Sequence, residues 1–540
     1  MKVTEKANIR RGKIGYSDSG MISTASKVAT EAGVGILEKG GNAFDAAVAA
    51  AFCLGVTEPQ ASGLGGQSMA VLYLAQEGKA LAIDGSSRVP FSFDPRQFPL
   101  KPLKTGVLAT TVPSTPATLG YILERYGTMG LEEVLNPAII AAREGFEISS
   151  LQHRLIQREF DLLINDPLAA KNFFSQGAAL KANKTLKQTE LADCLMHMAQ
   201  AGWRDFYLGR IAGTIIADME QRGGWLSQAD LSQIPIPQER PALEASYRGL
   251  DYVTFPPPGA GQTLVKILNI MENFTPGELD LDHPLGILIL AAAFRFAMRS
   301  RERMPIDPDL YIQSINKLMT DKTYAAEIAD RIQTLLQIHT PELWMPPVTS
   351  GETTHLSVAD RQGNMIGITQ SIELVFGSKT TARGLGFFYN NYMSAFNYTD
   401  PTHPYYLLPG ARPWSSVAPT IFFRNKRPFL LLGSPGSERI STTLAQVISR
   451  VLDGKKDLFT AIEAPRLHTR SSGRVSLENE RISRTIIEYL SGTGFPLVNR
   501  GSYSFYLGSV QGILIGSKDE KPLFIGVADP RRDGTAKGPV

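Results

Sequence analysis

The fold is decided in the stretch Gly351-Glu352-Thr353-Thr354-His355, where an alternating apolar segment begins. Residues 354–359 and 364–371 are each typical of a β-strand, and Asp-Arg-Gln-Gly between them is a hairpin signal. A helix is expected at 442–452, and further short strands are predicted at 386–390, 420–423, 429–433, 512–515 and 524–527. The last third of the chain is therefore predicted to be rich in strands.

The chain before this stretch is mainly helical in pattern. Two helices separated by Gly40-Gly41 are predicted within residues 25–54, with Ser26 and Asn42 as their N-caps. A strand-like pattern covers residues 69–83, and the clearer later helices are predicted at 119–126, 131–144, 186–201 and 211–222. Because helices come first and strands later, without βαβ alternation, we expect a layered α+β or αββα architecture rather than a Rossmann fold.

The composition is that of an ordinary globular enzyme. The 540 residues have a formal charge of +3 and no long Lys/Arg run, so nucleic acid is not expected as a partner. The start has no apolar stretch to serve as a signal peptide. The most apolar later segment, 285–294, is about half of the ~20 residues that a membrane span needs. We therefore expect a soluble, cytoplasmic protein without a membrane partner.

Metal and cofactor sites are not expected. Cys53 and Cys194 are the two cysteines, and the seven histidines lack the close spacing of a zinc site. Gly63-Leu-Gly-Gly66 lacks the full glycine fingerprint of a phosphate loop and predicts a tight turn. Gly433-Ser-Pro-Gly436 does not match the nucleophile elbow of a serine hydrolase. It is better explained as a turn that presents backbone N–H groups.

Thr353 has an ordinary interpretation, as a threonine that opens a strand. If the peptide bond after Glu352 were broken, Thr353 would have a hydroxyl and a free α-amine on one residue. An α-amine has a reference pKa of about 7.7–8.0, so it can act as the base for that hydroxyl at neutral pH. An amidase built in this way needs no separate histidine or aspartate.

Nine segments follow one another in an order that is informative as a whole. They are Lys39-Gly-Gly-Asn-Ala-Phe-Asp, Glu58-Pro-Gln-Ala-Ser-Gly-Leu-Gly-Gly66, Val112-Pro-Ser-Thr115, Phe255-Pro-Pro-Pro, Thr353-Thr-His-Leu-Ser, Asn390-Asn391, Gly433-Ser-Pro-Gly, Glu463-Ala-Pro-Arg-Leu-His468 and Ala528-Asp-Pro-Arg-Arg-Asp-Gly534. Together they resemble the γ-glutamyltransferases (γ-glutamyltranspeptidases) of the N-terminal-nucleophile hydrolase superfamily. The resemblance implies a four-layer αββα sandwich that cuts itself before Thr353. The products would be a mainly helical large subunit, residues 1–352, and a strand-rich catalytic small subunit, residues 353–540, of the same precursor.

The resemblance also implies a nucleophile and its immediate surroundings. Thr353 would attack the acyl carbonyl and form an acyl-enzyme, which water or an acceptor amine would then release. The backbone N–H groups of Gly436 and Ser437 would stabilise the oxyanion. The family usually has a second glycine where Ser437 stands, and because the donor is backbone we expect this change to be tolerated. Ser371 matches a threonine that hydrogen-bonds the nucleophile.

One end of the acyl pocket is retained in the residues that match the family pattern. Ser415 and Ser416 match a serine pair that receives the α-carboxylate of the substrate. Arg88 matches the arginine that pairs with the same carboxylate, and its planar fork suits bidentate binding. We therefore expect the substrate to carry a carboxylate at its acyl end.

The other end of the pocket departs from the family pattern. Where an Asn, a Gln and an Asp hold the glutamyl ammonium, this chain has Glu373, Tyr392 and Ala395. The missing aspartate removes a charge-assisted hydrogen bond with a net worth of about 1.5–3 kcal/mol. Glu373 would offer a charge from another direction, and Tyr392 adds an aromatic face. The segment 396–414 is shorter than in members with a long lid, which predicts a more open site.

These residues predict a γ-glutamyltransferase-like amidohydrolase that cleaves γ-glutamyl or glutaryl-type amides. Two alternatives stay open at this point. The first is an orthodox glutathione hydrolase or γ-glutamyltransferase, in which Glu373 serves the ammonium. The second is an uncleaved, catalytically inactive member of the family that acts by binding.

Overall fold

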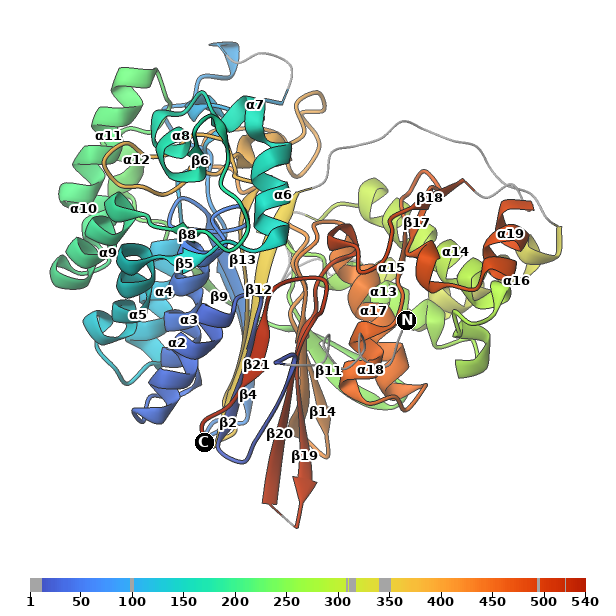
Figure 1. The fold of residues 1–540 in the computed structure, drawn as a ribbon. Helices are drawn as coiled ribbons and strands as arrows, with labels where there is room; N and C mark the ends of the chain where they lie inside the picture. Colours follow the sequence, from blue (N-terminus) through green and yellow to red (C-terminus); the bar gives the residue numbers. More distant parts are fainter. Residues whose placement is uncertain are drawn as a thin grey trace.

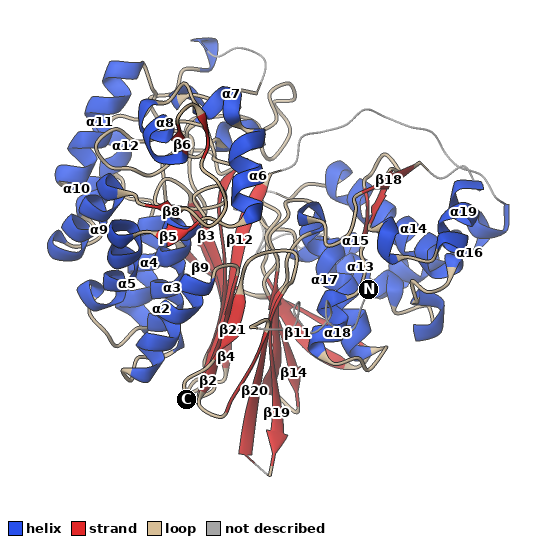
Figure 2. Cartoon of the chain, viewed as in Figure 1, coloured by secondary structure: helices blue, strands red, loops and turns tan. Residues whose placement is uncertain are grey.

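The computed structural model describes residues 12–97, 102–306, 309, 317–338, 351–492, 496–519 and 521–540. Two antiparallel seven-stranded sheets lie face to face at its centre, and helices cover the outer face of each (Figures 1 and 2). This is the predicted four-layer αββα arrangement.

Sheet A and sheet B are the two large sheets. Sheet A has the order β1 (Ile14–Ser17), β20 (Lys521–Ala528), β19 (Gln511–Lys518), β15 (Arg427–Gly433), β14 (Thr420–Arg424), β11 (Leu250–Thr254) and β10 (Leu243–Tyr247). Sheet B has the order β21 (Thr535–Lys537), β2 (Gly20–Thr24), β12 (Glu352–Asp360), β13 (Met365–Glu373), β3 (Gln67–Leu74), β4 (Lys79–Gly85) and β9 (Gln238–Pro241). Residues before and after the predicted cut therefore contribute strands to both sheets.

Two helical layers complete the sandwich. The helices on the side of sheet B are α2 (Lys27–Glu38), α3 (Ala43–Thr57), α4 (Thr115–Tyr126), α5 (Leu131–Glu144), α6 (Ser150–Arg158), α7 (Phe160–Leu163), α8 (Pro167–Phe173), α9 (Thr189–Ala201), α10 (Asp205–Leu208), α11 (Arg210–Arg222) and α12 (Gln228–Ser232). Those on the side of sheet A are α13 (Gly261–Met271), α14 (Pro284–Arg303), α15 (Lys317–Thr320), α16 (Lys322–Ile338), α17 (Arg439–Leu452), α18 (Leu458–Glu463) and α19 (Arg484–Gly492).

Smaller elements connect the layers. The short strands are β5 (Phe146–Glu147), β6 (Phe174–Ser175), β7 (Ala178–Ala179), β8 (Thr185–Leu186), β16 (Leu467–Thr469), β17 (Val475–Leu477) and β18 (Leu497–Asn499). The 3₁₀ helices are η1 (Pro95–Gln97), η2 (Val107–Ala109), η3 (Pro276–Leu279), η4 (Tyr392–Ala395), η5 (Asn479–Arg481) and η6 (Phe505–Leu507).

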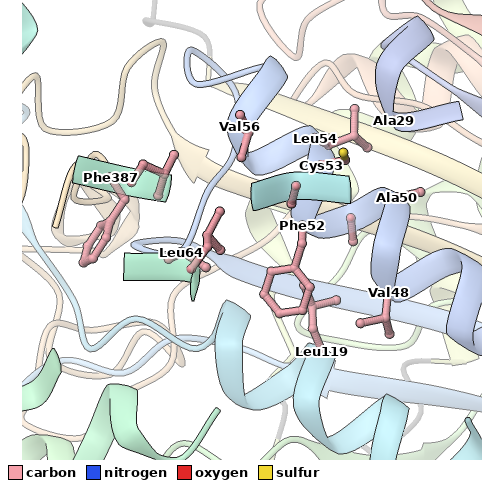
Figure 3. Packing of buried hydrophobic residues seen from close by; sticks show 14 of the residues in the cluster. Ala29, Val48, Ala50, Phe52, Cys53, Leu54, Val56, Leu64, Leu119 and Phe387 are labelled. Atoms are coloured by element: carbon pink, nitrogen blue, oxygen red, sulfur yellow. The ribbon is translucent and has the colours of Figure 1, made fainter. Parts of the chain in front are cut away.

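Helix α3 shows how local sequence positions the layer over sheet B. The Asn42 side chain accepts hydrogen bonds from the N–H groups of Phe44 and Asp45, and the Asp45 carboxylate accepts one from the Asn42 N–H. The alanine-rich body that follows packs closely against α2, α5 and sheet B. Figure 3 shows Cys53 of this helix within the hydrophobic core, as predicted for a buried apolar residue.

Three hydrophobic clusters fill the spaces between the four layers. One lies between sheet B and its helices, and another lies between sheet A and its helices. The third lies between the sheets and includes Met69 and Val71 from β3, Ile421 from β14, Leu431 from β15 and Ile513 from β19. Because side chains alternate along a strand, each of these strands supplies apolar residues to both of its faces.

The predicted strand at 386–390 is wrong. Gly386 has a left-handed backbone with φ of +82°, and a Cβ there would lie 2.4 Å from the backbone nitrogen of Leu191. The side chain of Asn390 donates to the carbonyls of Gly65 and Thr111. The segment is a loop that packs against other loops, and one isolated bridge from Thr381 to Phe388 is its contribution to pairing.

Within the described ranges, no helix combines the length and apolar character that crossing a membrane requires. The cytoplasmic location stays a prediction.

Candidate active site

Thr353 lies near the start of β12, at an irregular point in the centre of sheet B. Glu352 pairs with Glu373 of β13, whereas Thr354 pairs with Gln370. Between these pairs β12 has one residue and β13 has two, so a bulge places Ser371 and its neighbour opposite Thr353. The chain is continuous from Glu352 to Thr353, and Thr353 is buried. The contacts described below are those of the uncut chain.

Ser371 holds the carbonyl group of the peptide bond that is predicted to break. Its hydroxyl donates to the Glu352 carbonyl oxygen at 2.6 Å and accepts from the Glu373 N–H at 2.9 Å. A glycine makes this approach possible, since a Cβ on Gly66 would lie 2.3 Å from the Ser371 carbonyl oxygen. A donor at this oxygen polarises the carbonyl toward attack.

The Glu352 side chain is also fixed, by an ion pair with Arg532. Arg532 donates to the carboxylates of Glu352 at 3.1 Å and Glu58 at 3.2 Å, and Thr354 donates its hydroxyl to Glu58. Burial raises the pKa of both carboxyls, and the Arg532 guanidinium opposes that rise. Sequence reasoning assigned no role to Glu58 or Arg532, although both lie in motifs that matched the family.

His355 is a structural residue rather than a base. Its Nδ1 lies 2.8 Å from the Thr369 hydroxyl and its Nε2 lies 3.1 Å from the Ser357 hydroxyl. Burial lowers the pKa of His355 to about 3, so the ring is neutral at physiological pH. Gly433 of β15 makes room for it, because a Cβ there would lie 2.0 Å from Cε1 of the imidazole. The ring thus joins the two sheets beside the nucleophile.

Gly436 and Ser437 form the turn between β15 and α17. Both have positive φ, +129° and +52°, and their carbonyls accept from the N–H groups of Arg439 and Ile440. Among the described residues, the N–H groups of Gly436 and Ser437 donate to no protein acceptor. They stand at the N-terminus of a 14-residue helix, where backbone donors and the helix dipole favour an anion. The positive φ at Ser437 explains why glycine suits this position.

Arg88 follows a residue that is bound to sheet B close to Ser371. The Gln67 side chain accepts from the Ser87 N–H at 2.9 Å, and Gln67 and Ser371 both oppose the rise that burial causes in the pKa of Tyr392. The half-buried guanidinium of Arg88 follows Ser87 directly. Burial and the neighbouring Arg412 guanidinium lower the pKa of Arg88, and Asp84 opposes them. Arg88 and Tyr392 therefore lie in the same part of the uncut chain, and their roles in an acyl pocket stay predictions.

Ser415 and Ser416 lie in the loop before β14, on the side of sheet A. Arg301 of α14 donates to the Ser415 carbonyl at 2.6 Å and to the Ser416 hydroxyl oxygen at 3.1 Å. The Ser415 N–H donates to the carbonyl of Pro258. In the part of the chain that the structure describes, the hydrogen bonds of these two serines run to Arg301 and Pro258 rather than to Arg88. Sequence reasoning did not identify Arg301, because nothing local marks a helix arginine as the partner of a distant loop.

The altered end of the pocket contains an ionisable group beside the nucleophile. Glu373 has a left-handed backbone with φ of +80°, and burial raises the pKa of its carboxyl to about 7 although the Arg439 guanidinium opposes this. Burial also raises the pKa of Tyr392, and Glu373 adds to that effect. Ala395 ends η4 and is half-buried. Glu373 and Tyr392 therefore lie together near Thr353, whereas Ala395 contributes only a methyl group.

A metal-binding cluster is not evident in the described ranges, where no group of three His, Cys, Asp or Glu residues could hold an ion.

The comparisons with known proteins agree with this geometry. The family model described as Gamma-glutamyltranspeptidase matches residues 29–538. The chain belongs to this family. It is 32% identical over 533 residues to the glutathione hydrolase proenzyme of Escherichia coli (strain K12), covering 95% of this chain and 90% of that protein. It is also 32% identical over 496 residues to the Acylase ACY 1 proenzyme of Pseudomonas sp. (strain SE83), covering 89% of this chain and 87% of that protein.

A solved structure supports the same assignment. The cephalosporin acylase from Bacillus halodurans superposes with a TM-score of 0.86 and 26% sequence identity, over 97% of this chain and 96% of that one. Membership of the γ-glutamyltranspeptidase family confirms the predicted fold class and the predicted enzyme class, an amidohydrolase of the N-terminal-nucleophile type. The roles of the individual site residues stay predictions.

Proposed function

We propose that this γ-glutamyltranspeptidase-family protein cuts itself between Glu352 and Thr353 and then hydrolyses amides whose acyl part ends in a carboxylate. The observation that supports this most strongly is the Ser371 hydroxyl, 2.6 Å from the carbonyl oxygen of Glu352 and opposite Thr353 in the bulge. A donor on this carbonyl next to a threonine hydroxyl is what an intramolecular acyl shift needs.

Self-cleavage follows from this placement in two steps. The Thr353 hydroxyl attacks the Glu352 carbonyl carbon, and the peptide C–N bond breaks as the nitrogen takes up a proton. Glu352 is then held to Thr353 by an ester. Water hydrolyses that ester, which leaves a carboxylate on Glu352 and a free α-amine on Thr353.

The same hydroxyl then serves the substrate amide. The Thr353 α-amine accepts the hydroxyl proton as the oxygen attacks the acyl carbonyl. The N–H groups of Gly436 and Ser437 stabilise the oxyanion, and the proton passes to the leaving amine. Water or an acceptor amine then attacks the acyl-enzyme and releases the acyl group. The substrate carboxylate binds at Arg88, with Ser415 and Ser416 as the other expected donors.

Glutaryl-type amides are the substrates that we propose for the altered end of the pocket. A γ-glutamyl group brings an ammonium there, and Ala395 offers it no carboxylate. Tyr392 fills the space with a buried aromatic ring. A glutaryl group has no ammonium and suits this surface. The second candidate, a glutathione-handling γ-glutamyltransferase, is favoured by Glu373, whose pKa of about 7 makes it an anion above neutral pH.

Two measurements test the proposal. On a denaturing gel, the purified wild-type protein is expected to give two bands and Thr353→Ala one band near 58.9 kDa. A single band for the wild type would contradict self-cleavage. Glutaryl and γ-glutamyl anilides are then compared by kcat/KM, and a strong preference for γ-glutamyl would favour the second candidate.

A further inference from the structure

Three arginines lie around the side chain of Tyr506. One of them, Arg439, comes directly after the turn that is proposed to hold the oxyanion. The guanidinium carbons of Arg439 and Arg500 lie 4.2 Å and 3.7 Å from the centre of the Tyr506 ring. Arg470 donates to the Tyr506 hydroxyl at 3.3 Å. We call these four residues the Tyr506 cluster. Stacking on an aromatic ring fixes a guanidinium while leaving its N–H edge available to a planar anion.

Two nitrogens of the Arg439 guanidinium lack an acceptor among the described residues. Its side chain is 0% exposed, and its Nε donates to the Tyr506 carbonyl at 2.8 Å. Among the described residues, its Nη1 and Nη2 atoms have no hydrogen-bond partner. A buried guanidinium with unpaired N–H groups is costly in a folded protein, so an acceptor supplied by a bound anion would stabilise Arg439.

The cluster has more positive than negative charge. In the described part of the chain, Glu438 is the carboxylate within ion-pair distance of these arginines, at 2.7 Å from Nε of Arg470. Arg439 and Arg500 have no carboxylate within 4 Å there. Burial lowers the pKa of Arg500, and the nearby guanidinium groups lower it further. An anion bound here would relieve this repulsion.

The cluster adjoins the reaction centre but is separate from the Arg88 end of the pocket. The Arg439 N–H donates to the Gly436 carbonyl at 3.1 Å, and its guanidinium opposes the rise that burial causes in the pKa of Glu352 and of Glu373, which pair across β12 and β13 beside Thr353. The charged groups that act on Arg88 are Arg412, Asp84, Asp309 and Arg240, and none belongs to the cluster. The molecule thus has two separate cationic positions, Arg88 and the Tyr506 cluster.

We propose that the Tyr506 cluster binds a carboxylate on the amine part of the substrate, the part that leaves when the acyl-enzyme forms. This inference rests on the proposed function. The acyl carboxylate already has Arg88, so a second anion held beside the oxyanion turn belongs to the other side of the scissile bond. The preferred leaving groups and acceptors are then amines that themselves carry a carboxylate, and neutral amines bind less well.

Two anilides with the same acyl group test this directly. One releases 4-nitroaniline, which is neutral, and the other releases 5-amino-2-nitrobenzoate, which carries a carboxylate. The readout is the ratio of kcat/KM for the carboxylated anilide to that for the neutral one. Arg500→Gln is the first variant, because Arg500 is partly exposed at the edge of the cluster, and Arg470→Gln is the second. The matched control is Arg424→Gln, which removes an exposed arginine stacked on Phe429 at 4.2 Å in the β14–β15 hairpin.

We expect the ratio to fall about tenfold in each cluster variant, the equivalent of one lost charge-assisted hydrogen bond, and to stay unchanged in Arg424→Gln. An unchanged ratio in both cluster variants would overturn the inference while leaving the proposed function intact.

Direct binding gives a second readout that does not depend on turnover. Equilibrium dialysis of 5-amino-2-nitrobenzoate against wild-type protein and Arg500→Gln is expected to show about tenfold weaker binding in the variant. If the wild-type protein hydrolyses neither anilide, the proposed function is refuted. The dialysis experiment would still show whether the Tyr506 cluster binds a carboxylate. Equal binding by the two proteins would rule the site out.

Discussion

Replacing Ser371 with alanine is expected to slow self-cleavage without unfolding the protein. The Ser371 hydroxyl lies 2.6 Å from the Glu352 carbonyl oxygen, which gains negative charge as Thr353 attacks. A hydrogen bond to a charged oxygen is worth about 1.5–3 kcal/mol. Its loss corresponds to a rate that is about 10-fold to 150-fold lower. Alanine also leaves the Glu373 N–H without the acceptor that it has at 2.9 Å.

The assay follows the precursor band after a pulse of synthesis. Samples taken over time on denaturing gels give the rate at which the 58.9 kDa chain is converted to two fragments. Ser371→Thr is the matched control, because it keeps the hydroxyl and restores the residue that relatives are expected to have. Circular dichroism and thermal melting show whether each variant is folded. A folded Ser371→Ala protein that matures at the wild-type rate would refute the role given to this hydroxyl.

Three further predictions concern charge and packing around the site. In the uncut Thr353→Ala background, Arg532→Gln leaves two buried glutamates without their cation and is expected to lower the free energy of unfolding by about 3–5 kcal/mol. The folded-state pKa of each glutamate is raised, so this penalty grows as pH rises and shrinks as pH falls. Urea denaturation at pH 5 and pH 8 should therefore differ, and equal losses would count against the ion pairs. The Glu373 carboxyl, with its pKa raised to about 7, gains its charge as pH rises through neutrality. From pH 6 to pH 8, KM for a γ-glutamyl anilide should therefore fall and KM for a glutaryl anilide should rise. Glu373→Gln should make both KM values independent of pH over this range. If the pH dependence persists in that variant, another group is responsible for it. Gly433→Ala places a methyl group 2.0 Å from a ring carbon of His355 and is expected to cost about 1–3 kcal/mol or more, seen as a lower Tm, with an unchanged Tm contradicting the clash.

Helices and hairpins that depend on neighbouring residues could be predicted from the sequence. Asn42 and the glycine pair before it specify the start of α3, and the hairpin of β12 and β13 follows from alternation and its turn. Residues 243–254 form β10 and β11 within a region that was predicted to be mainly helical. These strands lie at one edge of sheet A, and the pairing of β11 with β14 joins segments about 170 residues apart. Such pairing leaves little trace in a sequence window.

In the candidate site, too, some features follow from local sequence and others depend on contacts between distant segments. Thr353 could be proposed as the nucleophile from the sequence, because its chemistry belongs to one residue and its neighbours match a family pattern. The contacts that hold it depend on tertiary structure: Arg532 reaches Glu352 across 180 positions of sequence. Arg301 reaches Ser415 across 114 positions. The N–H edge of Arg439 is free of acceptors among the described residues because of how distant segments pack around it. No sequence pattern encodes an absence of that kind.

The order of strands in sheet B has a consequence for the kinetics of refolding. β12 pairs with β2 on one side and β13 on the other, so after the proposed cut its two neighbours would belong to different polypeptides. In sheet A the four adjacent strands β20, β19, β15 and β14 come from one product, and β1 at one edge and β11 and β10 at the other edge come from the other product. The uncut chain can regain this arrangement in a first-order reaction. After denaturation of the cleaved protein, its two chains must find each other by diffusion. The rate of refolding should then depend on the square of the protein concentration, and refolding should fail on dilution. The stability of the uncut chain is set by its folding equilibrium, whereas the cleaved protein would persist for a time set by its rate of unfolding.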